Sequence, residues 1–201
     1  MEHLLSCKYP EIKIFSIQIE KLGIKDKAPG IAIVDGNKKR FFTAAHWFFK
    51  GNKGRYRVYK KEKVIGNVTK IKYLGNDIAQ LEIGKEKPPL LEGIASTFST
   101  QKFRTQIEIE VVEPFKLKVL EKGTITCYFK YQTKRGSFEK RYGYGCDGQR
   151  FKEGDSGKGV ISEKNEIFII TGVSELSKPI KFSDGTAIKK IVFINPIPAL
   201  K

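Results

Sequence analysis

The sequence is poor in the features that mark membrane-spanning, secreted and metal-binding proteins. Its 201 residues hold no apolar run long enough to cross a bilayer. Residues 1–15 mix charged with apolar residues and lack the continuous apolar core of a secretion signal. There are only three cysteines and two histidines, with no CxxC pair, and His3 and His46 lie far apart. We therefore expect no membrane association and no metal site.

The cysteines also bear on the redox compartment. Cys7, Cys127 and Cys146 are few, odd in number and widely spaced, which favours a reducing compartment. We expect free thiols and a cytoplasmic protein, in the cytoplasm of the host cell if the chain is viral. A bridge between Cys127 and Cys146 is the alternative.

Helix signals are scarce, whereas strand-forming residues are plentiful. Hydrophobic residues make up 40% of the chain and include 14 Phe and 8 Tyr, and no long stretch repeats apolar residues at helical spacing. This composition predicts a folded, all-β protein.

Short extended runs alternate with glycine-rich and polar turns along the whole chain. The predicted strands of the first half cover residues 11–20, 31–35, 40–45, 54–61, 62–74 and 77–83, with "KAPG" (27–30) as a turn. Those of the second half cover 102–113, 115–132, 137–146, 158–162, 166–174 and 187–195. A proline-containing segment, 84–101, separates the halves. We expect two domains, 1–90 and 91–201, each a barrel or sandwich of about six strands.

Positive charge is the strongest anomaly of the composition. The chain has 38 Lys and Arg against 22 Asp and Glu, and residues 51–72 hold eight basic residues opposed only by Glu62. Such a field attracts nucleic acid or acidic surfaces. A solvated, lysine-rich hairpin explains the same residues, so both interpretations stay open.

The motif "GDSG" (154–157) is a candidate for nucleophilic chemistry. Hydrolysis by a serine needs a hydroxyl on a tight turn, a histidine base, a carboxylate that orients the histidine, and N–H donors for the developing oxyanion. Glycines on both sides of Asp155-Ser156 permit such a turn, with the N–H groups of Gly154 and Ser156 as the oxyanion donors. A structural Asp-Ser-Gly turn is the alternative.

Two further segments supply the missing groups. "TAAH" (43–46) places His46 after an apolar strand, and "DIAQL" (77–81) places Asp77 at the start of another. Each residue alone has a structural explanation, as a core histidine or a turn cap. Together they follow the order His, Asp, Ser with gaps of 31 and 79 residues, which differs from the α/β-hydrolase order.

These three motifs resemble the active-site signatures of the trypsin-like, chymotrypsin-fold serine peptidases, over about residues 30–174. The resemblance implies an all-β fold of two six-stranded antiparallel β-barrels, with the active site in the cleft between them. The short chain, the lack of paired cysteines and the missing C-terminal helix look more like bacterial glutamyl peptidases and viral 3C-like members than like digestive trypsins.

The resemblance also implies the roles of the site residues. His46 would be the general base and then the general acid, Asp77 would hold its tautomer, and Ser156 would attack the scissile carbonyl. The enzyme would be a serine endopeptidase of restricted specificity that acts on protein or peptide substrates and needs no cofactor or metal.

Substrate selection would depend on two further segments. Gly172, Val173 and Ser174 would line the first specificity pocket, and Arg150 would lie at its base and favour Asp or Glu in the substrate. Ser174 stands where glutamyl and 3C-like enzymes commonly carry histidine, which weakens that preference. Asp155 lacks the family's N-terminal ammonium partner in this chain, and Lys158 replaces the usual glycine.

Two other functions compete with this one. The fold can serve as a catalytically silent binding module for RNA, since "KFRTQI" (102–107) resembles an RNA-binding stretch of picornaviral 3C proteases, and Tyr142 and Tyr144 could stack on bases. In that case nucleic-acid binding through the basic surface would be salt-dependent. The same triad could also hydrolyse esters.

Overall fold

The computed structural model describes residues 12–48, 51–94, 107–133 and 140–198. These residues form strands joined by short turns, so the predicted all-β class is confirmed. The described residues also include two single-turn helices, η1 (Ala45–Trp47) and η3 (Glu153–Asp155). No helix in the described ranges is long and apolar enough to cross a bilayer.

The first half forms a closed antiparallel barrel with the strand order β1-β2-β3-β7-β6-β5. Its strands are β1 (Ile12–Lys21), β2 (Asp26–Asp35), β3 (Lys38–Ala44), β5 (Tyr56–Lys60), β6 (Lys63–Gly75) and β7 (Ile78–Gly84). The alternation read from the sequence of β1 is real, since Ile17 and Ile19 point into the core and are at most 2% exposed.

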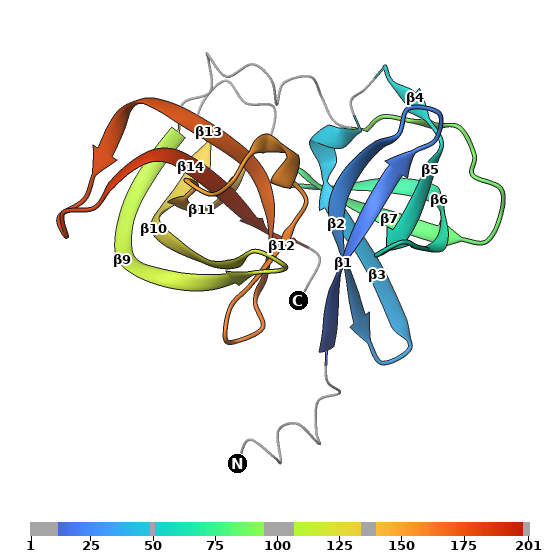
Figure 1. Cartoon of the computed structure of the whole chain (residues 1–201), viewed down its shortest axis with the longest axis horizontal. Helices are drawn as coiled ribbons and strands as arrows, with labels where there is room; N and C mark the ends of the chain where they lie inside the picture. The colour runs from blue at the N-terminus through green and yellow to red at the C-terminus, as the bar shows by residue number, and fades with distance from the viewer. Residues whose placement is uncertain (1–11, 49–50, 95–106, 134–139, 199–201) are drawn as a thin grey trace, which may run out of the picture.

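The second half forms a second closed barrel, with the order β10-β11-β14-β13-β12-β9. Its strands are β9 (Ile107–Val119), β10 (Gly123–Thr133), β11 (Tyr142–Asp147), β12 (Gly159–Ile161), β13 (Ile167–Lys181) and β14 (Ala187–Pro196). Figure 1 shows the two barrels side by side. Two six-stranded antiparallel barrels are therefore confirmed.

A small two-stranded sheet lies next to the first barrel. It pairs β4 (Lys53–Gly54) with β8 (Leu91–Glu92), so residues 91 and 92 contact the N-terminal half of the chain. The predicted domain boundary between residues 90 and 91 remains a prediction, and most of the expected linking segment lies outside the described residues.

The prediction of a turn at "KAPG" is wrong, because residues 27–30 lie inside β2. Pro29 is opposite Gln18 of β1, whereas the pairing of β2 with β3 begins only at Gly30. Proline lacks an N–H group, so it fits in a strand only at a position where that group would have no partner in the neighbouring strand. The carbonyl of Pro29 accepts a hydrogen bond from Thr43 Oγ1 at 2.8 Å.

An apolar cluster joins the two barrels. Ile31, Phe42 and Ile78 of the first barrel pack with Ile169 of the second, and all four are fully buried. Burial of each such side chain is worth about 1.5–3 kcal/mol, so the cluster stabilises the packing of the two barrels.

Glycine allows the closest approach between the barrels. Gly157 has a φ of +106°, and a Cβ atom there would lie 2.0 Å from Pro29 O and 2.9 Å from Thr43 Oγ1. Thr43 of the first barrel thus faces the turn that carries Ser156.

A disulfide joins Cys127 to Cys146. The two residues are directly opposite each other on β10 and β11. The expectation of free thiols at these positions is therefore wrong, and the alternative bridge is the arrangement found. Neither cysteine carries a sequence signal for it, since 19 residues separate them and only the strand register brings them together.

Replacement of Gly157 by alanine should be strongly destabilising. Gly185 is the matched control, because its φ of +89° is equally unfavourable for alanine but nothing lies within 4 Å of an added Cβ. We expect Gly185→Ala to cost about 1–2 kcal/mol of unfolding free energy, and Gly157→Ala to cost about 1–3 kcal/mol more. Urea denaturation measures both, and equal losses would contradict the close contact.

The disulfide predicts a count of reactive thiols. Alkylation of the denatured, unreduced chain should modify one cysteine, and alkylation after reduction should modify three, as intact mass spectrometry would report. Three adducts without reduction would show that the bridge does not form.

Candidate active site

Asp77 lies at the tip of the β6–β7 hairpin. Asn76 and Asp77 form its two-residue loop, with φ values of 57° and 59°, the φ pattern of a type I′ turn. Asparagine and aspartate tolerate this left-handed conformation better than other non-glycine residues. The turn carries Asp77 into the interior, where it is 2% exposed.

Residues of the second barrel hold the tip of this hairpin. Asn76 Oδ1 accepts a bond from the N–H of Tyr142 at 2.8 Å, and its Nδ2 donates to Pro196 O at 3.2 Å. Asn195 Nδ2 donates to Asn76 O at 2.8 Å, and the hydroxyl of Tyr131 donates to Asn195 Oδ1. Burial raises the pKa of Tyr131, which keeps this phenol a neutral donor. The turn that presents Asp77 is thus fixed between the barrels.

His46 lies in η1, next to Asp77. The N–H of Ala45 donates to Asp77 O at 2.7 Å, and His46 Nδ1 is 2.8 Å from Asp77 Oδ2. A carboxylate at this distance accepts the Nδ1 hydrogen, which leaves Nε2 of the ring as an acceptor. The His46 side chain is 24% exposed and that of Asp77 only 3%, so the pair combines a buried carboxylate with an accessible imidazole.

A cation from the second barrel also faces the same carboxylate. Arg141 Nη1 is 3.7 Å from Asp77 Oδ2, and the side chain of Arg141 is 16% exposed. Asp77 Oδ1 has no hydrogen-bond partner among the described residues. Burial of a carboxylate is costly without opposite charge, and Arg141 supplies that charge from the second barrel.

Ser156 directly follows η3 and is bonded to the neighbour of His46. Trp47 Nε1 donates to Ser156 O at 3.0 Å across the barrels. The rings of Trp47 and His46 stack at 5.8 Å between centroids. The structure thus connects Ser156 to the segment that carries His46, through a tryptophan that the sequence interpretation did not single out.

Two features of the proposed chemistry are not formed in this structure. No hydrogen bond among the described residues joins the His46 ring to the Ser156 hydroxyl. The N–H of Ser156 donates to Glu153 O at 3.0 Å, inside the η3 turn, and Ser156 is 2% exposed. The role of Gly154 and Ser156 as oxyanion donors stays a prediction, and it requires this turn to open.

Asp155, whose partner the sequence left open, contacts the ammonium groups of two lysines and the backbone N–H of a third. Its Oδ2 accepts bonds from Lys122 Nζ at 2.8 Å and from the N–H of Lys152 at 3.0 Å, and its Oδ1 is 3.9 Å from Lys158 Nζ. Burial alone raises the pKa of Asp155, but the bond from Lys122, the bond from Lys152 and the two lysine charges outweigh it and hold this pKa below its usual value. Lys158 therefore turns back toward Asp155.

Arg150 is bonded to the turn between β9 and β10. Its Nη1 donates to Lys122 O at 3.4 Å and its Nη2 donates to Thr124 O. The selection of acidic substrates by this guanidinium stays a prediction. Two of its N–H groups already donate to backbone carbonyls.

Gly172, Val173 and Ser174 lie on β13 and pair on one side with β14. The short strand β12 pairs only with residues 167–169 of β13. Within the described strands, the other edge of residues 172–174 is therefore unpaired, and its backbone groups are available to an extended chain.

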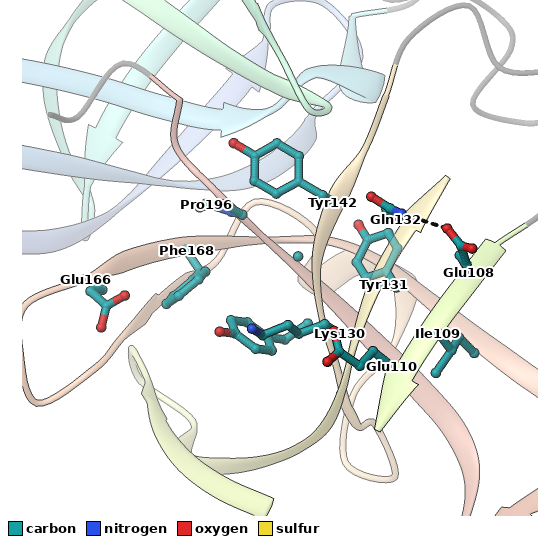
Figure 2. Close-up of a pocket in the computed structure, with 12 residues that line it drawn as sticks. Glu108, Ile109, Glu110, Lys130, Tyr131, Gln132, Tyr142, Glu166, Phe168 and Pro196 are labelled. Atoms are coloured by element: carbon teal, nitrogen blue, oxygen red, sulfur yellow. Dashed lines mark hydrogen bonds between the residues drawn. The ribbon is translucent and has the colours of Figure 1, made fainter. Parts of the chain in front are cut away.

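A pocket of about 680 Å³ is lined by residues of the second barrel, of which Tyr142 and Pro196 are bonded to Asn76, next to Asp77 (Figure 2). Its lining is aromatic and acidic: Glu108, Ile109, Glu110, Lys130, Tyr131, Gln132, Tyr142, Gly143, Tyr144, Glu166, Phe168 and Pro196. Both tyrosines considered for base stacking belong to it. Tyr144 packs edge-on against Phe115 and Phe168, whereas Tyr142 is 46% exposed.

The basic hairpin lies on β5 and β6 of the first barrel, and part of its charge packs on the barrel's own rings. Lys60 Nζ lies 4.0 Å from the centre of the Phe15 ring, and Arg57 Nε donates to Asn67 Oδ1 at 3.2 Å. Of the RNA-binding resemblance at 102–107, residues 102–106 lie outside the described part of the chain.

Sequence reasoning missed Trp47, Lys122 and Arg141. Trp47 had a weak signal, as the sole tryptophan of the chain and the neighbour of His46. Lys122 and Arg141 had no sequence signal, because each contacts an aspartate that is distant in the sequence. For Lys122 and Asp155 the separation is 33 residues.

No group of histidine, cysteine or carboxylate side chains that could hold a metal ion occurs in the described ranges.

No protein-family model and no curated protein matches the chain. Among solved structures, it is similar to the crystal structure of the active form of the Rv3671c protease from M. tuberculosis. The identity is 15% and the TM-score 0.41, and the match covers 98% of this chain and 85% of that chain.

Proposed function

We propose that the chain is a serine endopeptidase that cleaves peptide bonds through an acyl-enzyme, with His46, Asp77 and Ser156 as its catalytic residues. One observation carries the proposal. His46 is bonded to the buried Asp77 while its neighbour Trp47 is bonded to Ser156 from the other barrel. A base with a fixed tautomer and a serine on a glycine-flanked turn are the parts that acyl transfer needs.

The proposed reaction proceeds in two steps. Nε2 of His46 takes the Ser156 proton as the serine oxygen attacks the carbonyl carbon, and then gives that proton to the leaving amine. Water attacks the resulting ester by the same route, which restores the serine. Asp77 stabilises the imidazolium that forms in each step, and it stays ionised.

The oxyanion needs N–H donors, and the Ser156 N–H is engaged with Glu153 O. We infer that the Glu153–Gly154 peptide turns when substrate binds, which frees this N–H and directs that of Gly154 to the same point. Glycine favours such a turn because no Cβ opposes it. Each donor of this kind is worth about 2.7–4 kcal/mol in the transition state.

An extended substrate would bind as an added strand along residues 172–174 of β13. The unpaired edge supports this mode, in which backbone bonds supply affinity and pockets supply selectivity. Arg150, Gly172, Val173 and Ser174 remain the proposed substrate-binding residues.

The competing function is a binding module with an unused triad. The buried Ser156 and its engaged N–H favour it, since both describe a site closed to substrate. Recognition of RNA by Tyr142 is disfavoured, because Glu108, Glu110 and Glu166 line the same pocket and repel phosphate. Weak nucleic-acid binding would have to use the basic hairpin instead.

Labelling by a peptidyl phosphonate ester separates the two functions. The wild-type chain should form a covalent adduct at Ser156, because the reagent captures only an activated serine. Ser156→Ala should form none, and Asp77→Asn should react about 10⁴-fold more slowly because the tautomer of His46 is lost. Mass spectrometry of the intact chain and of its peptides measures the adduct.

Ser183→Ala is the matched control, because Ser183 is exposed on the turn between β13 and β14, outside the proposed site, and it should retain labelling at Ser156. A folded wild-type chain that acquires no more adduct than Ser156→Ala would rule out the peptidase. A peptide library digested by wild type and by Ser156→Ala would then identify the residue preferred at the cleavage site.

A further inference from the structure

Asp155 is a buried carboxylate placed directly before the proposed nucleophile. It is 2% exposed and has no role in the proposed proton transfers. The charged side chains that face it are Lys122, on the turn between β9 and β10, and Lys158, on its own turn. A buried charge of this kind must be paired, and removal of its partner leaves an uncompensated ion.

Lys122 makes more contacts with this turn than Lys158 does. Its Nζ donates to Asp155 Oδ2 at 2.8 Å and to Arg150 O at 3.0 Å, and it lies 4.9 Å from the centre of the Phe151 ring. Arg150 in return donates to Lys122 O. The β9–β10 turn and residues 150–155 are therefore tied in both directions.

We infer that Lys122 is a positioning residue, which sets the conformation of the Ser156 turn by holding the Asp155 carboxylate. The inference rests on the proposed function in one respect only, that the positioned residue is the nucleophile. Lys158 is a weaker partner, because its ammonium is 3.9 Å from the carboxylate. Without Lys122, the carboxylate would have to move toward water, and Ser156 would move with it.

The chain contains its own reporter of this movement. Trp47 is the sole tryptophan, and its indole N–H donates to Ser156 O at 3.0 Å. In a ¹⁵N-labelled chain this group gives one indole resonance, whose position depends on that hydrogen bond. The resonance reports on the turn whether or not the protein is an enzyme.

The decisive experiment compares three variants by this resonance and by the rate of phosphonate labelling. Lys122→Met should shift the indole resonance and lower the maximal labelling rate about 10²-fold, the scale of a 1 Å misplacement, with little change in the half-saturating concentration. Lys122→Arg keeps the charge and should retain most of the rate. Lys118→Met, at an exposed lysine of β9, should match the wild type in both measurements.

Acid titration of the wild-type chain gives the same answer without a variant. The pKa of Asp155 lies below its usual value, so the carboxylate stabilises the fold at neutral pH, and this contribution is lost as the pH falls through the lowered pKa. The indole resonance should therefore move below about pH 4, before the fold is lost. This titration decides the matter if Lys122→Met does not fold.

The outcomes separate the two proposals. An indole resonance that is unchanged in folded Lys122→Met, or that moves in acid only with global unfolding, would overturn the positioning role, even if the wild type is labelled. A resonance that shifts in Lys122→Met while the wild type resists labelling would retain the positioning role and reject the peptidase.

Discussion

The arrangement of the site depends on the hydrogen bonds that fix the Asn76–Asp77 turn between the two barrels. Asn76 uses its side-chain oxygen, its side-chain nitrogen and its carbonyl oxygen in bonds to the second barrel. Because the loop has only two residues, the position of Asn76 determines that of Asp77, and Asp77 in turn orients His46. A buried polar network of this kind holds one geometry well when its members are satisfied.

The two buried aspartates are stabilised in different ways that suit their different surroundings. Asp77 lies between the imidazole of His46 and the guanidinium of Arg141. Asp155 is held by two lysine ammonium groups and a backbone N–H, none of which has a part in the proposed proton transfers. In the proposed reaction the first carboxylate accompanies proton transfer, and the second anchors the Ser156 turn.

Local patterns in the sequence were enough to predict most of the strands and to select His46, Asp77 and Ser156 as candidate catalytic residues. Alternation in β1 and the glycines around Ser156 each act over a few residues, so a single sequence reveals them. The predictions that failed depended on contacts between residues that are distant in the chain. The composition of "KAPG" is typical of a turn, and only the pairing of Pro29 with β1 shows that it belongs to a strand. The Cys127–Cys146 bridge follows only from the register of β10 and β11. The lysine that holds Asp155 could not be selected from so many others.

The type I′ loop at Asp77 also limits how this chain can vary in length. Side chains alternate between the faces of a strand, so one residue inserted between β6 and β7 would turn the carboxylate from the interior toward solvent. The turn after Lys60, at the outer end of the basic hairpin, carries no such residue. The turn after Lys60 is therefore compatible with insertions and fused segments, whereas the Asn76–Asp77 turn is not. The two hairpins nevertheless share strand β6.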